Sequence, residues 1–314
     1  MKHIFVFDSK VFFHQQWKLD AIIDSIRQFF RAQDQSDFSI YISRYRRHAM
    51  VLAEKEISKR APGEIVRIYA VGGEEILFDC TDIAAYLPNI EITSVPYGET
   101  NDFLQIFGSK NIELFRDIPS LVRGIVHPTD IIRWDINYAL NSCYIGLNPT
   151  ALKFDSDKHK FFFIYKILSF FNYVKAAFDK GVAAQFYEIR IDDKVFSGSY
   201  SLIHIANGPY FAGRKTGAVT AAVNDGFLDV TLIKAATPLK TIGLIRKYLR
   251  GKQVKNSISV RAKKIMIWSD VDMLVQIDQE YIKDTSIEVG IVHHALQMVT
   301  PDNLFYPLIP EPVS

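Results

Sequence analysis

The sequence predicts two joined domains, an α/β domain built on a parallel sheet followed by a mostly antiparallel β-sandwich. Segments typical of strands and of helices alternate through the first third of the chain. After about residue 128 the pattern changes to strand-like runs separated by turns. We therefore place the first domain at 1–128 and the second at 129–297, and expect residues 298–314 to return to the first domain.

The first domain is expected to contain short apolar strands connected by helices. The expected strands are IFVF (4–7), FSIYIS (38–43), VRIYAV (66–71) and IEITSVP (90–96). Between the first two strands, six apolar residues fall on one helical face: Leu19, Ile22, Ile23, Ile26, Phe29 and Phe30. Strands that alternate with helices of this length form parallel sheets through right-handed crossovers, and such sheets bind ligands at the carboxyl ends of their strands.

The second domain is expected to be mostly antiparallel because many of its runs alternate polar with apolar residues. Turn signals such as DD (192–193) and NDG (224–226) separate several of these runs. Two helices, at about 160–178 and 238–250, are expected to interrupt the strands.

Composition excludes several classes of protein. Apolar residues make up 48% of the 314 residues and the net charge is +2, which favours a soluble globular protein without a dominant nucleic-acid surface. The two cysteines, Cys80 and Cys143, form no CxxC pair, which is typical of a protein of the reducing cytosol.

No segment has the pattern of a membrane anchor. The N-terminus, MKHIFVFDSK, has too short an apolar core for a signal peptide. The most apolar segment, 161–178, is interrupted by Lys166 and Lys175, so it is not expected to cross a bilayer. We expect a cytoplasmic protein.

Four motifs, in this order, resemble those of the bacterial diacylglycerol kinase and lipid kinase catalytic-domain family. They are GGEEI (72–76) for the family's GGDGT, PYGETNDF (96–103) for P-x-G-T-x-N-D-F, the ANG and NDG segments of 206–233, and IDQEYI (277–282) for the D-G-E segment. Asn141 and Gly146 fit a further family strand. The resemblance extends to about residue 300 and implies a Rossmann-like, NAD kinase-like first domain, with sphingosine kinases and NAD kinases as fold relatives.

The resemblance implies an ATP site whose phosphates lie against the backbone of the diglycine motif. Glycines before a helix allow close approach of an anion, which the helix dipole also favours. The implied nucleotide-binding residues are Ser43, Gly72, Gly73, Glu74, Gly98, Asn101 and Asp102. Glu74 keeps the carboxylate of the family's aspartate, which could contact Mg²⁺ or its waters.

Several residues of this expected site depart from the family pattern. Glu75 and Ile76 replace a glycine and a threonine, Glu99 replaces another threonine, and DSKVF (8–12) replaces N-P-x-S-G. Two like charges about 4 Å apart repel by roughly 4 kcal/mol at an effective dielectric constant near 20. Mg²⁺, or a basic partner among Arg44, Arg46 and Arg47, could offset this repulsion. Read without the family, Glu74 and Glu75 could instead simply begin a helix and complement its dipole.

Two further sites are implied in the second domain. Glu280 is expected to be the base that takes the proton of the acceptor hydroxyl, with Asp278 two residues earlier and Gln279 in place of a family glycine. The alternative is an exposed hairpin tip with solvated carboxylates. A structural Mg²⁺ is expected at Asp225 with the carbonyls of Ala222 and Phe227, and the alternative there is a plain turn.

A lipid substrate would have to be reached at a membrane surface, which is expected to be the inner membrane face. Residues 246–264 hold eight Lys or Arg and no acid, a pattern that attracts anionic headgroups. A solvated helix end beside a lysine-guarded edge strand explains it equally well. The FFFIYKILSFF segment (161–171) could line a lipid cleft or belong to the core. His293 and His294 lack the usual ligand spacing and are given no role.

The resemblance therefore implies an ATP- and Mg²⁺-dependent lipid kinase that phosphorylates a hydroxyl of diacylglycerol or a related lipid. A protein of the same fold that binds nucleotide, lipid or a partner without turnover is the alternative, because the departures cluster at one pocket. A kinase with another acceptor, such as a sphingoid base or a soluble polyol, stays open. So does the oligomeric state, with a homodimer as one option.

Overall fold

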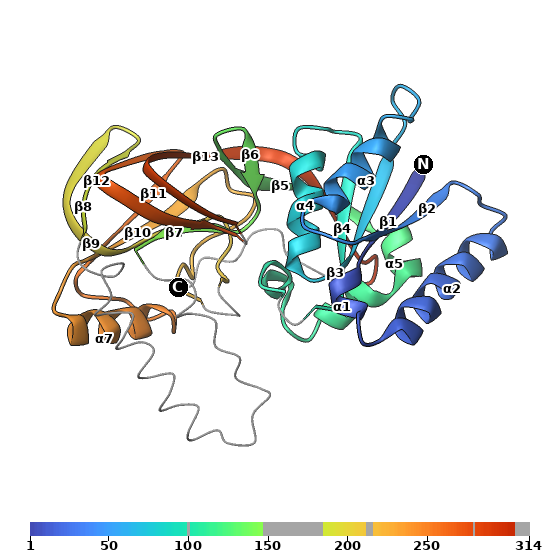
Figure 1. Cartoon of the computed structure of the whole chain (residues 1–314), viewed down its shortest axis with the longest axis horizontal. Coiled ribbons are helices and arrows are strands. Elements are labelled where there is room, and N and C mark those ends of the chain that lie inside the picture. Colours follow the sequence, from blue (N-terminus) through green and yellow to red (C-terminus); the bar gives the residue numbers. More distant parts are fainter. Residues whose placement is uncertain (99–100, 147–184, 212–215, 279, 305–314) are drawn as a thin grey trace, which may run out of the picture. The chain divides into compact units, whose positions relative to one another are not determined.

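A computed structural model describes residues 1–98, 101–146, 185–211, 216–278 and 280–304 (Figure 1). The chain forms two compact units, Met1–Ile131 together with Val292–Ser314, and Ile132–Ile291. The sequence placed these boundaries at 128/129 and 297/298. The helix expected at 160–178, including FFFIYKILSFF, and the expected site residue Glu99 lie outside the described residues.

Unit 1 contains the predicted parallel sheet, in the order β13-β4-β3-β1-β2. The strands are β1 (Lys2–Asp8), β2 (Phe38–Ser43), β3 (Val66–Gly72), β4 (Ile90–Pro96) and the end of β13 (Glu280–Thr300). The helices that follow the first three strands are α1 (Ser9–Phe12), α2 (Gln16–Ala32), α3 (His48–Ile57) and α4 (Glu74–Ala84). Strands and helices therefore alternate as the sequence predicts.

Burial explains why these segments form these elements. Strands β1, β3 and β4 are almost entirely buried, as expected for a parallel sheet. Helix α2 buries one stripe, made of Leu19, Ile23, Ile26 and Phe30. Phe30 stacks on Phe38 of β2 with ring centroids 4.7 Å apart, so the predicted apolar face packs on the sheet.

A buried ion pair connects the sheet to the segment that follows it. After β4 come two 3₁₀ helices, η1 (Phe103–Phe107) and η2 (Ile112–Arg116), then α5 (Ile118–Val122) and β5 (Ile125–Trp134). Arg67 of β3 donates to Glu91 of β4 over 2.6 Å and to the carbonyls of Leu121 and Val122. All formal charge at this buried site is thus paired, which is the condition for burying it.

Unit 2 is the predicted antiparallel part. Its ladder runs β11-β10-β9-β7-β12-β13, with β8 between β9 and β12, and β6 paired with β5. The elements are β6 (Asn137–Ala139), β7 (Ser142–Ile145), β8 (Gln185–Ile191), β9 (Lys194–Ala206), β10 (Leu228–Lys234), α7 (Pro238–Tyr248), β11 (Ser257–Ala262) and β12 (Lys264–Ile277). Helix α7 confirms the helix expected at 238–250.

The predicted turns occupy two different places. Asp192 and Asp193 form the two-residue connection of the β8–β9 hairpin, with Asp192 in the left-handed region at φ 47°. Asn224–Gly226 instead end the long connection between β9 and β10, where Asp225 Oδ1 accepts from the Phe227 N–H at 3.0 Å. In the described part of the chain, no helix is long and apolar enough to cross a bilayer.

Candidate functional site: a diglycine cradle and an anchored hairpin

The carboxyl ends of the parallel strands bring the expected phosphate-binding residues of unit 1 together. In the sheet register Asp8 lies beside Ser43, and Gly72 lies beside Pro96. Because β1 also pairs with β3, one sheet edge carries the ends of all four strands. This is the edge at which open parallel sheets bind ligands.

Two glycine loops pack backbone against backbone at this edge. The N–H groups of Tyr97 and Gly98 both donate to the Gly72 carbonyl, over 2.8 and 2.9 Å. A Cβ on Gly98 would overlap Gly73 Cα and lie 3.0 Å from Gly73 N, and one on Gly72 would lie 2.7 Å from Asp8 Cβ. The structure therefore admits only glycine at 72 and 98, and it joins two motifs that are distant in sequence. We call this contact the diglycine cradle.

Glu74 connects the helix after the cradle to the segment that follows Gly98. It is buried at the first turn of α4, and its Oε1 accepts the backbone N–H groups of Asp102 and Phe103, the latter over 3.2 Å. A carboxylate accepting backbone N–H groups forms strong, charge-assisted bonds. From the sequence we expected this carboxylate to approach Mg²⁺. In the structure it instead binds the backbone at the start of η1 and so connects η1 to α4.

The negative charge of Glu75 is paired with a lysine that the sequence did not predict as its partner. The Glu75 side chain is 44% exposed, and Lys10 Nζ lies 3.2 and 3.0 Å from its two carboxylate oxygens. Lys10 belongs to the DSKVF segment, so one departure from the family pattern supplies the cation that neutralises another. Among the three candidate arginines, Arg47 pairs with Asp82 of α4 over 2.5 Å. Lys10 precedes the three arginines that were expected to offset the acidic charge, so its pairing with Glu75 was not predicted.

Asp8 is the N-cap of a short helix at the position where the family has its N-P-x-S-G loop. Its Oδ1 accepts the Lys10 N–H over 2.9 Å and so caps the one-turn helix α1. Burial raises the pKa of this carboxyl, and the charge of Glu75 adds to the rise.

The other nucleotide-site candidates are near the same edge but engaged locally. Ser43 Oγ, which is buried, donates to the Tyr45 carbonyl over 3.3 Å, and Asn101 Nδ2 donates to the Gly98 carbonyl over 3.3 Å. Asp102 is buried and gives its N–H to Glu74. Roles in binding nucleotide for these residues stay predictions.

In unit 2, the hairpin that carries Glu280 is anchored rather than free. β12 and β13 are joined through Asp278, at φ 47° and almost fully buried. Its carboxylate accepts the N–H groups of Leu140, Asn141 and Ser142 over 2.6, 3.1 and 2.9 Å, and its own N–H donates to the Ser142 carbonyl. The alternative of a solvated tip is therefore wrong for Asp278. Glu280, at the start of β13, is half-buried.

The same turn also holds the ANG motif. The N–H groups of Asn207 and Gly208 donate to the Asn141 carbonyl over 2.9 and 3.1 Å, and Asn141 Nδ2 donates to the Tyr210 carbonyl. Asn207 Nδ2 returns a bond to the Leu140 carbonyl over 2.7 Å. Three motifs that the sequence treats separately thus converge on residues 140–142.

The residues expected to hold a structural Mg²⁺ are already matched with a cation. Arg261 Nη2 contacts Asp225 Oδ2, and the Arg261 guanidinium lies 4.5 Å from the centroid of the Phe227 ring. Arg261 Nε also lies 3.9 Å from Asp229, whose carboxyl has a raised pKa because it is buried. In this structure Arg261 therefore supplies the positive charge beside Asp225. Binding of Mg²⁺ by Asp225 with the carbonyls of Ala222 and Phe227 stays an untested prediction.

Comparisons with known proteins agree with this architecture. Residues 160–300 match the family model described as the YegS C-terminal NAD kinase beta sandwich-like domain. A protein of Staphylococcus aureus strain Mu3, named "Putative lipid kinase", is 24% identical over 302 residues, 94% of this chain and 97% of the relative. A solved structure, "A putative diacylglycerol kinase from Bacillus anthracis str. Sterne", superimposes with a TM-score of 0.73 at 19% identity, covering 97% of this chain and 98% of that one.

A second structure with the same description has a TM-score of 0.70 at 20% identity and covers 98% of each chain. The fold is therefore an α/β unit followed by a NAD kinase-like β-sandwich. Residues 160–300 thus match the YegS-type C-terminal domain, and nearly the whole chain is similar in sequence to a putative lipid kinase and in fold to a putative diacylglycerol kinase.

Proposed function

We propose that the protein is an ATP-dependent lipid kinase that transfers a phosphoryl group to a hydroxyl of diacylglycerol or a related lipid. The diglycine cradle is the observation that supports this most directly. It places backbone without side chains at the N-terminus of the 11-residue helix α4, where an anion is favoured by the helix dipole.

The residues of the cradle fit the phosphates of ATP better than they fit a metal ion. Gly72, Gly73 and Gly98 would hold the phosphates through backbone groups, and Ser43 ends the neighbouring strand at the same edge. When bound, ATP supplies the electrophilic phosphorus for transfer. Mg²⁺ is expected with ATP in this class of reaction, but Glu74 is bonded to the backbone of η1 and is not assigned to the ion.

Glu280 would accept the proton of the acceptor hydroxyl, and Asp278 would position it. Most of the catalysis of phosphoryl transfer is positioning, so the base must be held by its surroundings. The three backbone bonds to Asp278 fix the hairpin from which Glu280 projects.

The second candidate function is nucleotide or lipid binding without turnover, which is favoured by the clustering of the departures from the family pattern, among them DSKVF (8–12), Glu75 and Ile76, at one expected pocket. Titration calorimetry with Mg-ATP, followed by a lipid phosphorylation assay, separates the two. Micromolar binding together with phosphate transfer to diacylglycerol would support the kinase. Binding without transfer to diacylglycerol, a sphingoid base or a soluble polyol would support the binding protein, and no binding at millimolar nucleotide would exclude the kinase.

We also propose that the exposed basic segment brings the protein to an anionic membrane surface, such as the inner face of the cell membrane. The eight basic residues of 246–264 are all exposed, and two are paired: Arg261 with Asp225 and Lys264 with Glu288. Exchanging Arg246, Lys247, Arg250 and Lys252 for Gln should weaken binding to phosphatidylserine vesicles by a few kcal/mol, at about 1 kcal/mol per residue.

Vesicle co-sedimentation at two salt concentrations measures this effect. The matched control exchanges four exposed basic residues of unit 1, Arg27, Arg31, Lys55 and Lys59. An equal loss of binding in both quadruple variants would show that only net charge matters.

A further inference from the structure

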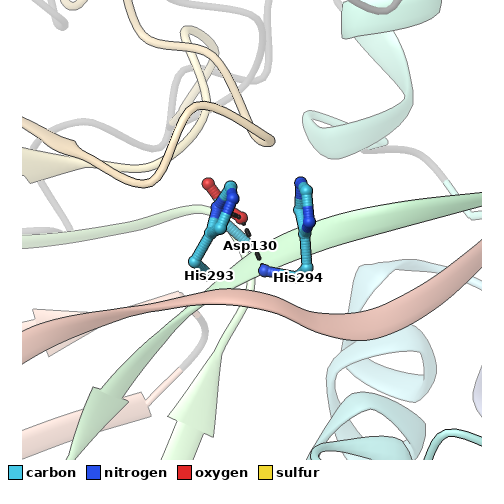
Figure 2. A group of neighbouring side chains, drawn as sticks. All are labelled: Asp130, His293 and His294. Carbon is cyan, nitrogen blue, oxygen red and sulfur yellow. Dashed lines mark hydrogen bonds and ion pairs between the residues drawn. The ribbon is translucent and has the colours of Figure 1, made fainter.

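Two consecutive histidines on β13 lie on the same side of their strand. In a regular strand, neighbouring side chains point to opposite faces. His294 instead adopts the left-handed conformation, with φ 53°, and its ring stacks on that of His293 with centroids 3.6 Å apart and an interplanar angle of 27°. Figure 2 shows both rings projecting from β13 in parallel, with Asp130 of β5 beside them.

This backbone conformation is unfavourable for a residue with a β-carbon. Strained conformations of this kind cost of order 1–3 kcal/mol and cluster at functional sites. The sequence gives the pair no role because adjacent histidines are not a usual ligand spacing. The left-handed residue, which the sequence does not reveal, changes that geometry.

A fully buried carboxylate completes the cluster. Asp130 is 0% exposed, and its Oδ1 lies 2.7 Å from His293 Nδ1 and accepts the His294 N–H over 2.8 Å. One ligand atom from each of the three residues lies within 4.8 Å of the other two. All three residues belong to unit 1.

We propose that Asp130, His293 and His294 form a binding site for a divalent transition-metal ion of the Zn²⁺ class. Two imidazole nitrogens and one carboxylate oxygen are a donor set of zinc sites, whereas Mg²⁺ and Ca²⁺ prefer oxygen ligands alone. Zn–N bonds of about 2.0–2.1 Å place neighbouring ligand atoms roughly 3.4 Å apart, so the ion would replace the 2.7 Å hydrogen bond between His293 Nδ1 and Asp130 Oδ1. The His293 side chain is 51% exposed, so the ion has a path from solvent to this ring.

The bound ion would join two strands at a particular place in the chain. The chain leaves unit 1 after Ile131, next to Asp130, and re-enters it at Val292, next to His293. A metal at this cluster therefore fastens β5 to β13 within unit 1 at both crossing points. This site is independent of the proposed phosphoryl transfer, because it uses none of the residues assigned to that reaction.

The test is competition for Zn²⁺ between a chromogenic chelator and the full chain after treatment with EDTA. We expect the wild type to bind one Zn²⁺ per chain, and His293→Gln and His294→Asn each to weaken binding by at least tenfold. Asparagine is chosen at 294 because it tolerates the left-handed conformation. Asp130→Asn, which keeps the shape of the buried group, should weaken binding by about 10–100-fold.

His14→Gln is the matched control, since His14 is an exposed histidine of the same unit outside the cluster. Circular dichroism without metal checks that each variant is folded, and Co²⁺ absorption in the visible range provides a second readout of histidine ligation. Zn²⁺ affinity that is the same in the wild type and in the folded His293→Gln and His294→Asn variants would overturn the proposal. So would the absence of one-to-one binding in the wild type, or an equal loss in His14→Gln.

Discussion

Glu280→Gln is expected to lower the turnover of lipid phosphorylation by about 10²–10⁴-fold, the usual contribution of a general base. The substitution keeps the size of the side chain and removes only its ability to accept a proton. Because Glu280 is half-buried at a strand end, the free energy of unfolding should change by no more than about 1 kcal/mol. A radiolabelled phosphate-transfer assay with diacylglycerol in mixed micelles, beside thermal unfolding, measures both quantities.

Two companion variants make the result specific. Glu188→Gln makes the same chemical change at an exposed position of β8 in the same unit and should retain full activity. Asp278→Asn should reduce kcat and also the free energy of unfolding, by about 1.5–3 kcal/mol for a lost charged hydrogen bond. Unchanged turnover in Glu280→Gln would remove this residue from the mechanism, whatever Asp278→Asn does.

Gly98→Ala is expected to open the diglycine cradle and to abolish nucleotide binding. The added methyl group would meet Gly73 Cα, Gly73 N and the Gly72 carbonyl oxygen, all of them backbone atoms that cannot rotate away. Overpacking of this kind costs about 1–3 kcal/mol and should break the bond from the Gly98 N–H to the Gly72 carbonyl. Denaturant unfolding and Mg-ATP calorimetry are the two measurements.

Gly73→Ala separates binding from folding at the same site. A Cβ on Gly73 has Gly98 Cα as its only neighbour within 4 Å among the described residues, at 3.6 Å, so the fold should tolerate it. The methyl group would nevertheless stand at the N-terminus of α4, where the phosphate is expected, and should weaken Mg-ATP binding. Gly243→Ala, in open space on α7, is the control and should stabilise the protein by up to about 1 kcal/mol. Full nucleotide affinity in Gly73→Ala would argue against a phosphate at the cradle.

The fold could be predicted because its signals are local and periodic. The stripe Leu19, Ile23, Ile26 and Phe30 specifies one face of α2, and the unbroken apolar runs of β1 and β3 specify strands buried on both sides. The position of NDG was harder to predict, because a turn signal does not say which strands it joins.

The candidate site was predictable as a set of positions but not as a set of contacts. Glycines 72 and 98 could be named from their motifs, yet their mutual contact depends on the sheet register. The pairing of Lys10 with Glu75 joins the helices α1 and α4 across 65 residues of sequence, and no local pattern encodes it. The three hydrogen bonds to the Asp278 carboxylate span 136 to 138 residues, so no local sequence pattern predicts them either.

The insertion of one unit within the other sets the order in which the chain can finish folding during synthesis. The β4 edge of the first sheet pairs with Gln297 and Met298, which the ribosome delivers only after the whole of Ile132–Ile291 has emerged. The second unit is contiguous in sequence, so its strands can pair first. During that time β4 is an unpaired edge strand of the first sheet. A nascent chain stalled before residue 297 should therefore expose that edge to chaperones, and release of the last strand should remove it.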